Sequence, residues 1–166
     1  PIDTSSIWLL EDGDLHLAAV HGMDPIALQS AYFASEQASL AMASALMSNE
    51  PVIRKPDDPL WPAGLAGRFE SNYSSIAAPL IVGGQPVGVL TLAHHTAGRY
   101  GHEAQAMTTT FASYAAAAIE NARLYDAAQE QAYASAALLQ VAQAVVSLSD
   151  LDEILGSIIR IMPILV

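Results

Sequence analysis

The sequence predicts an α+β fold in which a central antiparallel sheet carries helices on both faces and leads into a long C-terminal helix. Residues 74–82 and 86–94 are apolar runs on either side of Gly83-Gly84. Paired glycines between β-prone runs indicate a hairpin, because glycine adopts positive φ angles without a steric penalty. Residues 102–125 are rich in Ala and contain no Gly or Pro, which favours a long helix soon after the hairpin.

A hairpin followed by a long helix that ends in IENARLY, residues 119–125, resembles the end of a GAF domain. GAF domains are small-molecule-sensing and dimerisation modules of bacterial signalling proteins, with a PAS-like fold. Residues 6–14 resemble the first strand and turn of this family, and residues 15–22 resemble its second strand. Residues 39–45 resemble its middle helix, and residues 50–53 resemble the strand that follows. The resemblance covers roughly residues 5–130.

The connection between the second strand and the hairpin is long and lies at residues 23–73. We expect it to hold three helices and one short extended piece, at residues 25–33, 37–47, 63–70 and 51–54. Residues 55–62 form a Pro-rich loop that cannot be helical. The resemblance to GAF domains implies that this region covers the sheet and encloses a ligand pocket.

Side chains alternate across a strand, so the predicted strands can be sorted into two faces. One face is bulky and apolar, with Ile7, Leu9, Ile76, Leu80, Leu90 and Leu92. The opposite face is smaller and more polar, and the resemblance implies that it forms a pocket floor beneath an aromatic lid. The floor candidates are Ser6, Trp8, Leu10, Ser75, Ala77, Thr91 and Ala93, and the lid candidates are Trp61, Phe69 and Tyr73. In the alternative interpretation the aromatic side chains fill a closed core.

The composition argues against several classes of function. Six Lys and Arg against 17 Asp and Glu give a net charge of -11, which would repel nucleic acid and anionic lipid. The chain is 52% hydrophobic, but much of this is alanine and no run of about 18 apolar residues could span a membrane. Cysteine is absent, and no signal peptide is recognisable. These features predict a cytoplasmic protein without disulfides or thiolate metal sites.

No group of residues predicts an enzyme, a metal site or a cofactor. Residue 102 begins a pattern like the zinc-protease motif HExxH, but Ala106 stands where the second histidine is needed. His94 and His95 are adjacent at a strand end, so we expect them to point to opposite faces and not to share a metal ion. The family resemblance implies that bilin attachment and GAF-type methionine sulfoxide reductase activity both need a cysteine. Haem bound through His94 or His21 is kept as an alternative.

The helix that begins near residue 101 has no breaker until about residue 147, a length on the order of 70 Å. A break near Tyr125 followed by a fold-back is the alternative. A new helix is predicted to begin at residues 149–153, where Ser and Asp can cap it, and to end at Pro163.

The tail resembles the opening helices of another GAF domain, and the helix that precedes residue 6 in the family has no counterpart in the sequence. We therefore assign residues 1–130 to a GAF domain that lacks its first helix. Residues 131–166 are assigned to a linker helix and the opening helices of a next GAF-like domain. Because the bulky sheet face needs about two helices to cover it, we predict that helices 134–162 fill the vacant place.

Together these features predict a non-catalytic sensor module of a multidomain signalling protein, of the histidine kinase (two-component) or cyclase type. It would bind an unknown small molecule and relay its presence through the long helix. We expect a homodimer, paired through helix 102–148 as in a coiled coil and through tail helices 134–162. The rival predictions are a ligand-free dimerisation or spacer module and a haem-based sensor.

Overall fold

The computed structural model of this protein describes residues 3–165, apart from the side chains of residues 38, 144–150, 154, 157–158 and 161–165. The chain divides into two compact units, Pro1–Glu120 and Asn121–Val166. The elements of the first unit are β1 (Thr4–Glu11), β2 (Asp14–His21), α1 (Pro25–Ala34), α2 (Glu36–Ser48), β3 (Val52–Ile53), α3 (Pro62–Gly67), β4 (Ser74–Val82) and β5 (Gln85–His94). Helix α4 (His102–Leu165) belongs to both units.

The five strands form one sheet in the order β2-β1-β5-β4-β3, and every neighbouring pair is antiparallel. Both hairpins have two-residue turns in which both residues have positive φ. In the β4–β5 turn these are Gly83 at 57° and Gly84 at 81°, the conformation that matches the twist of the flanking strands. The predicted hairpin is therefore confirmed, and the α+β class with it.

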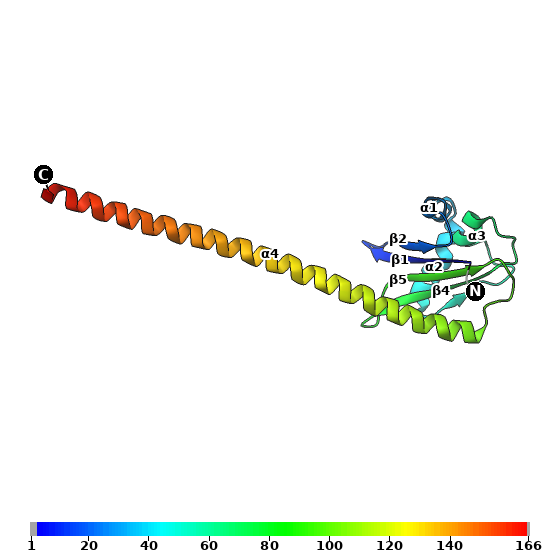
Figure 1. Cartoon of the computed structure of the whole chain (residues 1–166). Helices are drawn as coiled ribbons and strands as arrows, with labels where there is room; N and C mark the ends of the chain where they lie inside the picture. The colour runs from blue at the N-terminus through cyan, green and yellow to red at the C-terminus, as the bar shows by residue number, and fades with distance from the viewer. Residues whose placement is uncertain (1–2, 166) are drawn as a thin grey trace. The chain divides into compact units, whose positions relative to one another are not determined.

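The sheet separates two apolar cores, as the strand alternation predicts. On one face the core consists chiefly of Trp8, Ala77, Val89 and Ala93 packed with Leu28, Met42, Ala45, Trp61, Ala63 and Tyr73. On the other face Ala78, Leu80 and Leu90, with the partly buried Ile7, Leu9 and Leu92, pack against Ala112 and Ala116 of α4. Figure 1 shows α1, α2 and α3 over one side of the sheet and the first turns of α4 over the other.

Two helix ends in the lid show how the sequence directs local structure. Asp24 caps α1, because its carboxylate accepts from the N–H groups of Ile26 and Ala27 at 3.4 and 3.2 Å, and a proline follows at the first position. The predicted helix 63–70 is too long, since α3 ends at Gly67. Arg68 takes the left-handed conformation, and its N–H closes the helix on the carbonyls of Gly64 and Leu65.

Helix α4 is uninterrupted from His102 to Leu165, so the alternative of a break near Tyr125 is wrong. The separate helix predicted to begin at residues 149–153 is also wrong. The preceding turns are already helical and supply carbonyl acceptors, so no cap is required there. The predicted end at Pro163 is wrong as well, because the helix continues to Leu165.

The second unit, taken by itself, is a helix whose described apolar side chains are mostly exposed. These are Leu124, Tyr125, Tyr133, Leu138, Leu139, Val141, Leu151, Leu155 and Ile159. No helix among the described residues has the length and apolar character needed to cross a membrane.

Candidate functional site

A small cavity lies between the sheet and the lid helices. Its volume is about 10 Å³, and it is lined by Ser6, Trp8, Leu28, Met42, Trp61, Pro62, Ala63, Ser75 and Thr91. A cavity needs about 10–15 Å³ on this measure to hold one water molecule. The interior in this conformation therefore has room for a single water at most and none for an organic ligand.

The structure distributes the ten predicted pocket residues between the cavity wall and the surrounding core. Five of them line the cavity: Ser6, Trp8, Trp61, Ser75 and Thr91. Five others lie in the same apolar core without reaching the cavity: Leu10, Phe69, Tyr73, Ala77 and Ala93. The lid side chains Leu28, Met42, Pro62 and Ala63 also line the cavity, and they are not among the predicted pocket residues. Leu28 and Met42 were within predicted helices, but the weak amphipathicity of these segments did not indicate which side would face the sheet.

The polar groups around the cavity are bonded to one another. Trp8 Nε1 donates to Ser6 Oγ at 2.8 Å, and Ser6 Oγ lies 2.6 Å from Thr91 Oγ1. Ser75 Oγ donates to the carbonyl of Leu92 at 2.9 Å. Because each hydroxyl already has a protein partner, a polar ligand would have to replace existing hydrogen bonds.

The aromatic lid is held by Arg54, a buried residue that is not among the predicted site residues. Its guanidinium donates to three backbone carbonyls: Asp58 at 2.7 Å, Pro59 at 3.0 Å and Tyr73 at 3.1 Å. Its Cζ atom lies 4.3 Å from the centroid of the Tyr73 ring. Burial raises the pKa of Tyr73, and its hydroxyl accepts from the Trp61 N–H at 2.8 Å. No local sequence pattern indicates these contacts, because the partners lie up to 19 residues away.

Trp61 separates the cavity from an outer groove. The groove has a volume of about 330 Å³ and is lined by Gln37, Leu40, Ala41, Ser44, Val52, Asp58, Pro59 and Trp61. The same indole therefore forms part of the wall of both spaces.

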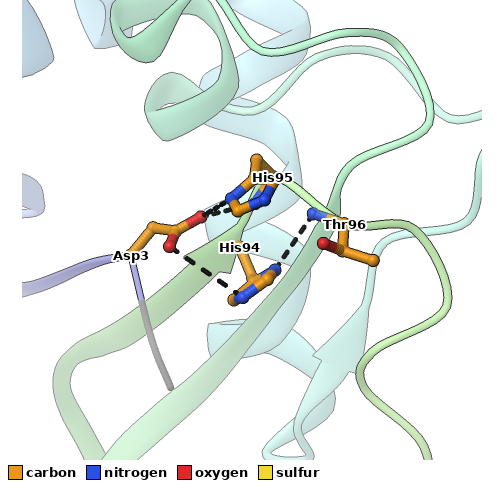
Figure 2. Close-up of polar contacts among 4 residues, drawn as sticks. All are labelled: Asp3, His94, His95 and Thr96. Carbon is orange, nitrogen blue, oxygen red and sulfur yellow. Dashed lines mark hydrogen bonds and ion pairs between the residues drawn. The ribbon is translucent and has the colours of Figure 1, made fainter.

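The expectation that His94 and His95 point to opposite faces is wrong. Strand β5 ends at His94, so the alternation of a strand does not extend to His95. The two rings are stacked, with centroids 4.5 Å apart, and both face the carboxylate of Asp3 (Figure 2). His95 Nδ1 lies 2.5 Å from Asp3 Oδ2, and His94 Nε2 lies 3.9 Å from Asp3 Oδ1.

The geometry gives no support to haem bound through His94 or His21. Neither histidine lines the cavity, and a volume of about 10 Å³ is far below what a porphyrin needs. Residue 102 lies at the exposed start of α4, as expected for an ordinary helix terminus.

The antiparallel sheet and the three short helices over one of its faces define a small α+β domain. A family model described as GAF domain matches residues 2–120. The chain belongs to the GAF domain family. No sequence among the curated proteins matches it significantly.

Solved structures with the same fold come from several kinds of protein. The GAF domain of a phosphoenolpyruvate-protein phosphotransferase from Coxiella burnetii is 26% identical, with a TM-score of 0.56 over 76% of this chain and 77% of that one. The GAF domain of a two-component sensor histidine kinase from Bacillus halodurans is 22% identical, with a TM-score of 0.55 over 75% of this chain and 86% of that one. A type II free methionine-R-sulfoxide reductase from Thermoplasma acidophilum is 23% identical, with a TM-score of 0.52 over 69% of this chain and 77% of that one.

Proposed function

We propose that this chain is a non-catalytic regulatory module of a multidomain signal-transduction protein, of the histidine kinase or cyclase type, whose interior is closed. The observation that carries the proposal is the cavity of about 10 Å³, whose hydroxyl groups are paired with protein groups. A module of this kind acts through the surfaces it presents and through α4. The occurrence of the same fold in a sensor histidine kinase and in a phosphotransferase supports a regulatory role.

The proposal that the module is non-catalytic rests on its side chains. One structural relative is a reductase, but that likeness concerns the fold. The family resemblance implies a cysteine nucleophile for this activity, and the chain has no cysteine. The polar groups nearest the cavity are Ser6, Ser75 and Thr91, and no histidine or carboxylate lines it. A hydroxyl without a base nearby is a poor nucleophile.

A small-molecule sensor is the second candidate, and the position of Trp61 favours it. Rotation of this indole away from the core would join the cavity to the outer groove of about 330 Å³. A ligand that binds the open arrangement better than the closed one would shift the population toward it. The lid and the packing of α4 on the opposite sheet face would then respond to the ligand.

We also propose a homodimer in which the tail of one copy covers the first unit of another. A groove of about 790 Å³ runs beside the first turns of α4, and its apolar wall includes Leu92, Met107 and Phe111. The side chains of Met107 and Phe111 are 55% and 60% exposed. Neighbouring exposed apolar side chains of this kind favour association. The tail offers Leu138, Leu139, Leu151, Leu155 and Ile159, and because α4 is uninterrupted we assign these residues to a second copy.

The division of the chain into domains follows the family resemblance. We propose that residues 1–130 form the GAF domain, and that residues 131–166 are a linker helix and the opening of a next GAF-like domain. A cytoplasmic location is proposed from the absence of cysteine and from the regulatory class.

The closed interior can be tested on the protein as it is purified from cells. The wild-type chain is denatured, and the small molecules that it releases are identified by mass spectrometry. They are compared with those released by a Thr91→Leu variant, whose larger side chain fills the cavity. A Thr110→Leu variant, at an exposed position of α4, is the matched control. We expect no stoichiometric small molecule from any of the three. A compound retained by the wild type and by Thr110→Leu, but lost from Thr91→Leu, would overturn the closed module and support the sensor.

A further inference from the structure

Three potential metal ligands meet at the end of the sheet where β5 ends. Asp3 comes from the segment before β1, and His94 and His95 come from the end of β5 (Figure 2). Each residue offers one ligand atom, and these atoms lie within 4.8 Å of one another. Among the residues that the structure describes, this is the one group of three such side chains close enough to share an ion.

We propose that Asp3, His94 and His95 form a binding site for a divalent transition-metal ion of the Zn²⁺ class. Imidazole nitrogens and carboxylate oxygens bind Zn²⁺ at about 2.0–2.2 Å, and three protein ligands with one solvent position are a common arrangement. The chain has no cysteine, so no thiolate competes for the ion. The bound metal would join the segment before β1 to the end of β5.

The backbone holds the three residues together before any ion arrives. The N–H of Asp3 donates to the carbonyl of Ala93 at 3.1 Å, and the N–H of His95 donates to Asp3 Oδ2 at 2.7 Å. Gly22 has a φ of +76°, and a Cβ atom there would lie 2.0 Å from the carbonyl oxygen of Asp3. The end of β2 can therefore lie against Asp3 because residue 22 has no side chain.

The site is open enough for an ion to enter and for water to complete its coordination. The His95 side chain is 68% exposed and the Asp3 side chain is 30% exposed, whereas His94 is 8% exposed. The exposed ligands can adjust their side-chain torsions, and the buried imidazole fixes the position of the third ligand. Such a combination suits an ion that arrives from solvent.

The local charges mostly favour a cation. The Asp3 carboxylate supplies the negative charge of the site, and it accepts the backbone N–H of His95 at 2.7 Å. The positive charge of Arg99 is close enough to act on His94, and it would weaken the binding of a cation there. The chain as a whole carries a net charge of -11.

Metal binding requires one specific rearrangement at His94. Its Nδ1 accepts from the N–H of Thr96 at 3.0 Å, so in the neutral ring the proton is on Nε2, which faces Asp3. A metal bound at Nε2 displaces that proton to Nδ1, because neutral imidazole carries one N–H. The hydrogen bond from Thr96 is then lost, and water can replace it because Thr96 is exposed. Asp3 and His95 must also separate slightly to admit the ion.

The test is Zn²⁺ titration of the tag-free chain by calorimetry, with Asp3→Asn and His95→Ala as the site variants. Both substitutions change exposed or half-exposed side chains, and circular dichroism checks that each variant is folded. His16→Ala is the matched control, because His16 is exposed and pairs with Leu9 toward the other end of β1. We expect one saturable site in the wild type and in His16→Ala. Affinity should fall at least about tenfold in the site variants, since even outer-shell partners contribute about 10- to 100-fold.

Long-range ¹H–¹⁵N spectra of the histidine rings provide a second readout that does not depend on a variant. We expect His94 to carry its proton on Nε2 without metal and on Nδ1 with Zn²⁺. Absence of saturable binding by the wild type would overturn the site, as would equal affinities of the site variants and the control. A His94 ring whose tautomer does not change at saturating Zn²⁺ would also overturn it as a three-residue site.

Discussion

Gly64 and Tyr73 are in such close contact that a Cβ atom added to Gly64 would lie 2.4 Å from Cζ of the tyrosine ring. The ring is held between α3 on one side and the guanidinium of Arg54 on the other, 4.3 Å from its centroid. The lid therefore contacts the residue just before β4 through the buried Tyr73 ring, which is 2% exposed.

Gly64→Ala should destabilise the first unit by about 1–3 kcal/mol, because the added methyl overpacks the site and displaces the Tyr73 ring. Urea unfolding followed by tryptophan fluorescence measures the change. Gly156→Ala is the control, since Gly156 is also helical and a Cβ atom there would meet nothing within 4 Å. Equal unfolding curves for the two variants would show that the contact with Tyr73 is not tight in solution.

Arg54→Lys should loosen the Pro-rich loop at residues 55–62 and cost about 2 kcal/mol or more of stability. Lysine cannot reproduce the planar fork that reaches three carbonyls, so buried acceptors lose their donors. The expected readouts are a lower midpoint in urea and faster limited proteolysis within this loop. Arg68→Lys, at an exposed position, should change neither. If the loop of Arg54→Lys is cleaved as slowly as the loop of the wild type, other contacts hold it in place.

Tyr100 should make the stability of the protein sensitive to alkaline pH. Burial raises its pKa to about 12, and its hydroxyl has no hydrogen-bond partner among the described residues. The folded state keeps the phenol neutral, whereas the unfolded chain ionises near pH 10. The group therefore has no pH-dependent effect on stability below about pH 10, and it lowers the stability of the folded state as the pH rises from 10 toward 12.

Tyr100→Phe should consequently match or slightly exceed the wild-type melting temperature at pH 7, and exceed it increasingly from pH 10 to pH 11. The measurement is thermal unfolding across this range. Tyr114→Phe is the control, because Tyr114 is 71% exposed and should follow the wild type throughout. A difference between Tyr100→Phe and wild type that does not grow with pH would contradict the burial of this hydroxyl.

Deletion of residues 134–166 should leave a poorly soluble or molten protein, because the apolar groove beside α4 would lose its cover. Light scattering should show that the full chain is a dimer. The substitution Leu138→Lys in the full chain should weaken this dimer. Gln131→Lys, at an exposed polar position, should not. A truncated chain that stays monomeric, soluble and cooperatively folded would rule out the proposed role of the tail.

Much of the fold follows from local features of the sequence. Gly83 and Gly84 indicate the β4–β5 hairpin because few other residues adopt positive φ at two consecutive positions. The strict alternation of strands separates Trp8 from Ile7 and Leu9, and the structure places them in different cores. The Ala-rich segment without Gly or Pro predicts α4. These features depend on backbone preferences and on a period of two or 3.6, which neighbouring residues alone determine.

Other features were decided by tertiary contacts between residues far apart in the chain. Five of the ten predicted pocket residues line the cavity, but its closure depends on lid side chains such as Leu28 and Met42, whose packing no local pattern specifies. Arg54 finds its carbonyl partners only after the loop and β4 meet. His95 turns toward Asp3 because the strand ends one residue earlier. The two residues are 92 positions apart in the chain, so no local pattern indicates this contact. The sequence by itself therefore determined the elements and the faces of the sheet. Packing determined whether the interior is open or closed and which polar side chains meet, because both depend on distances set by the assembled chain.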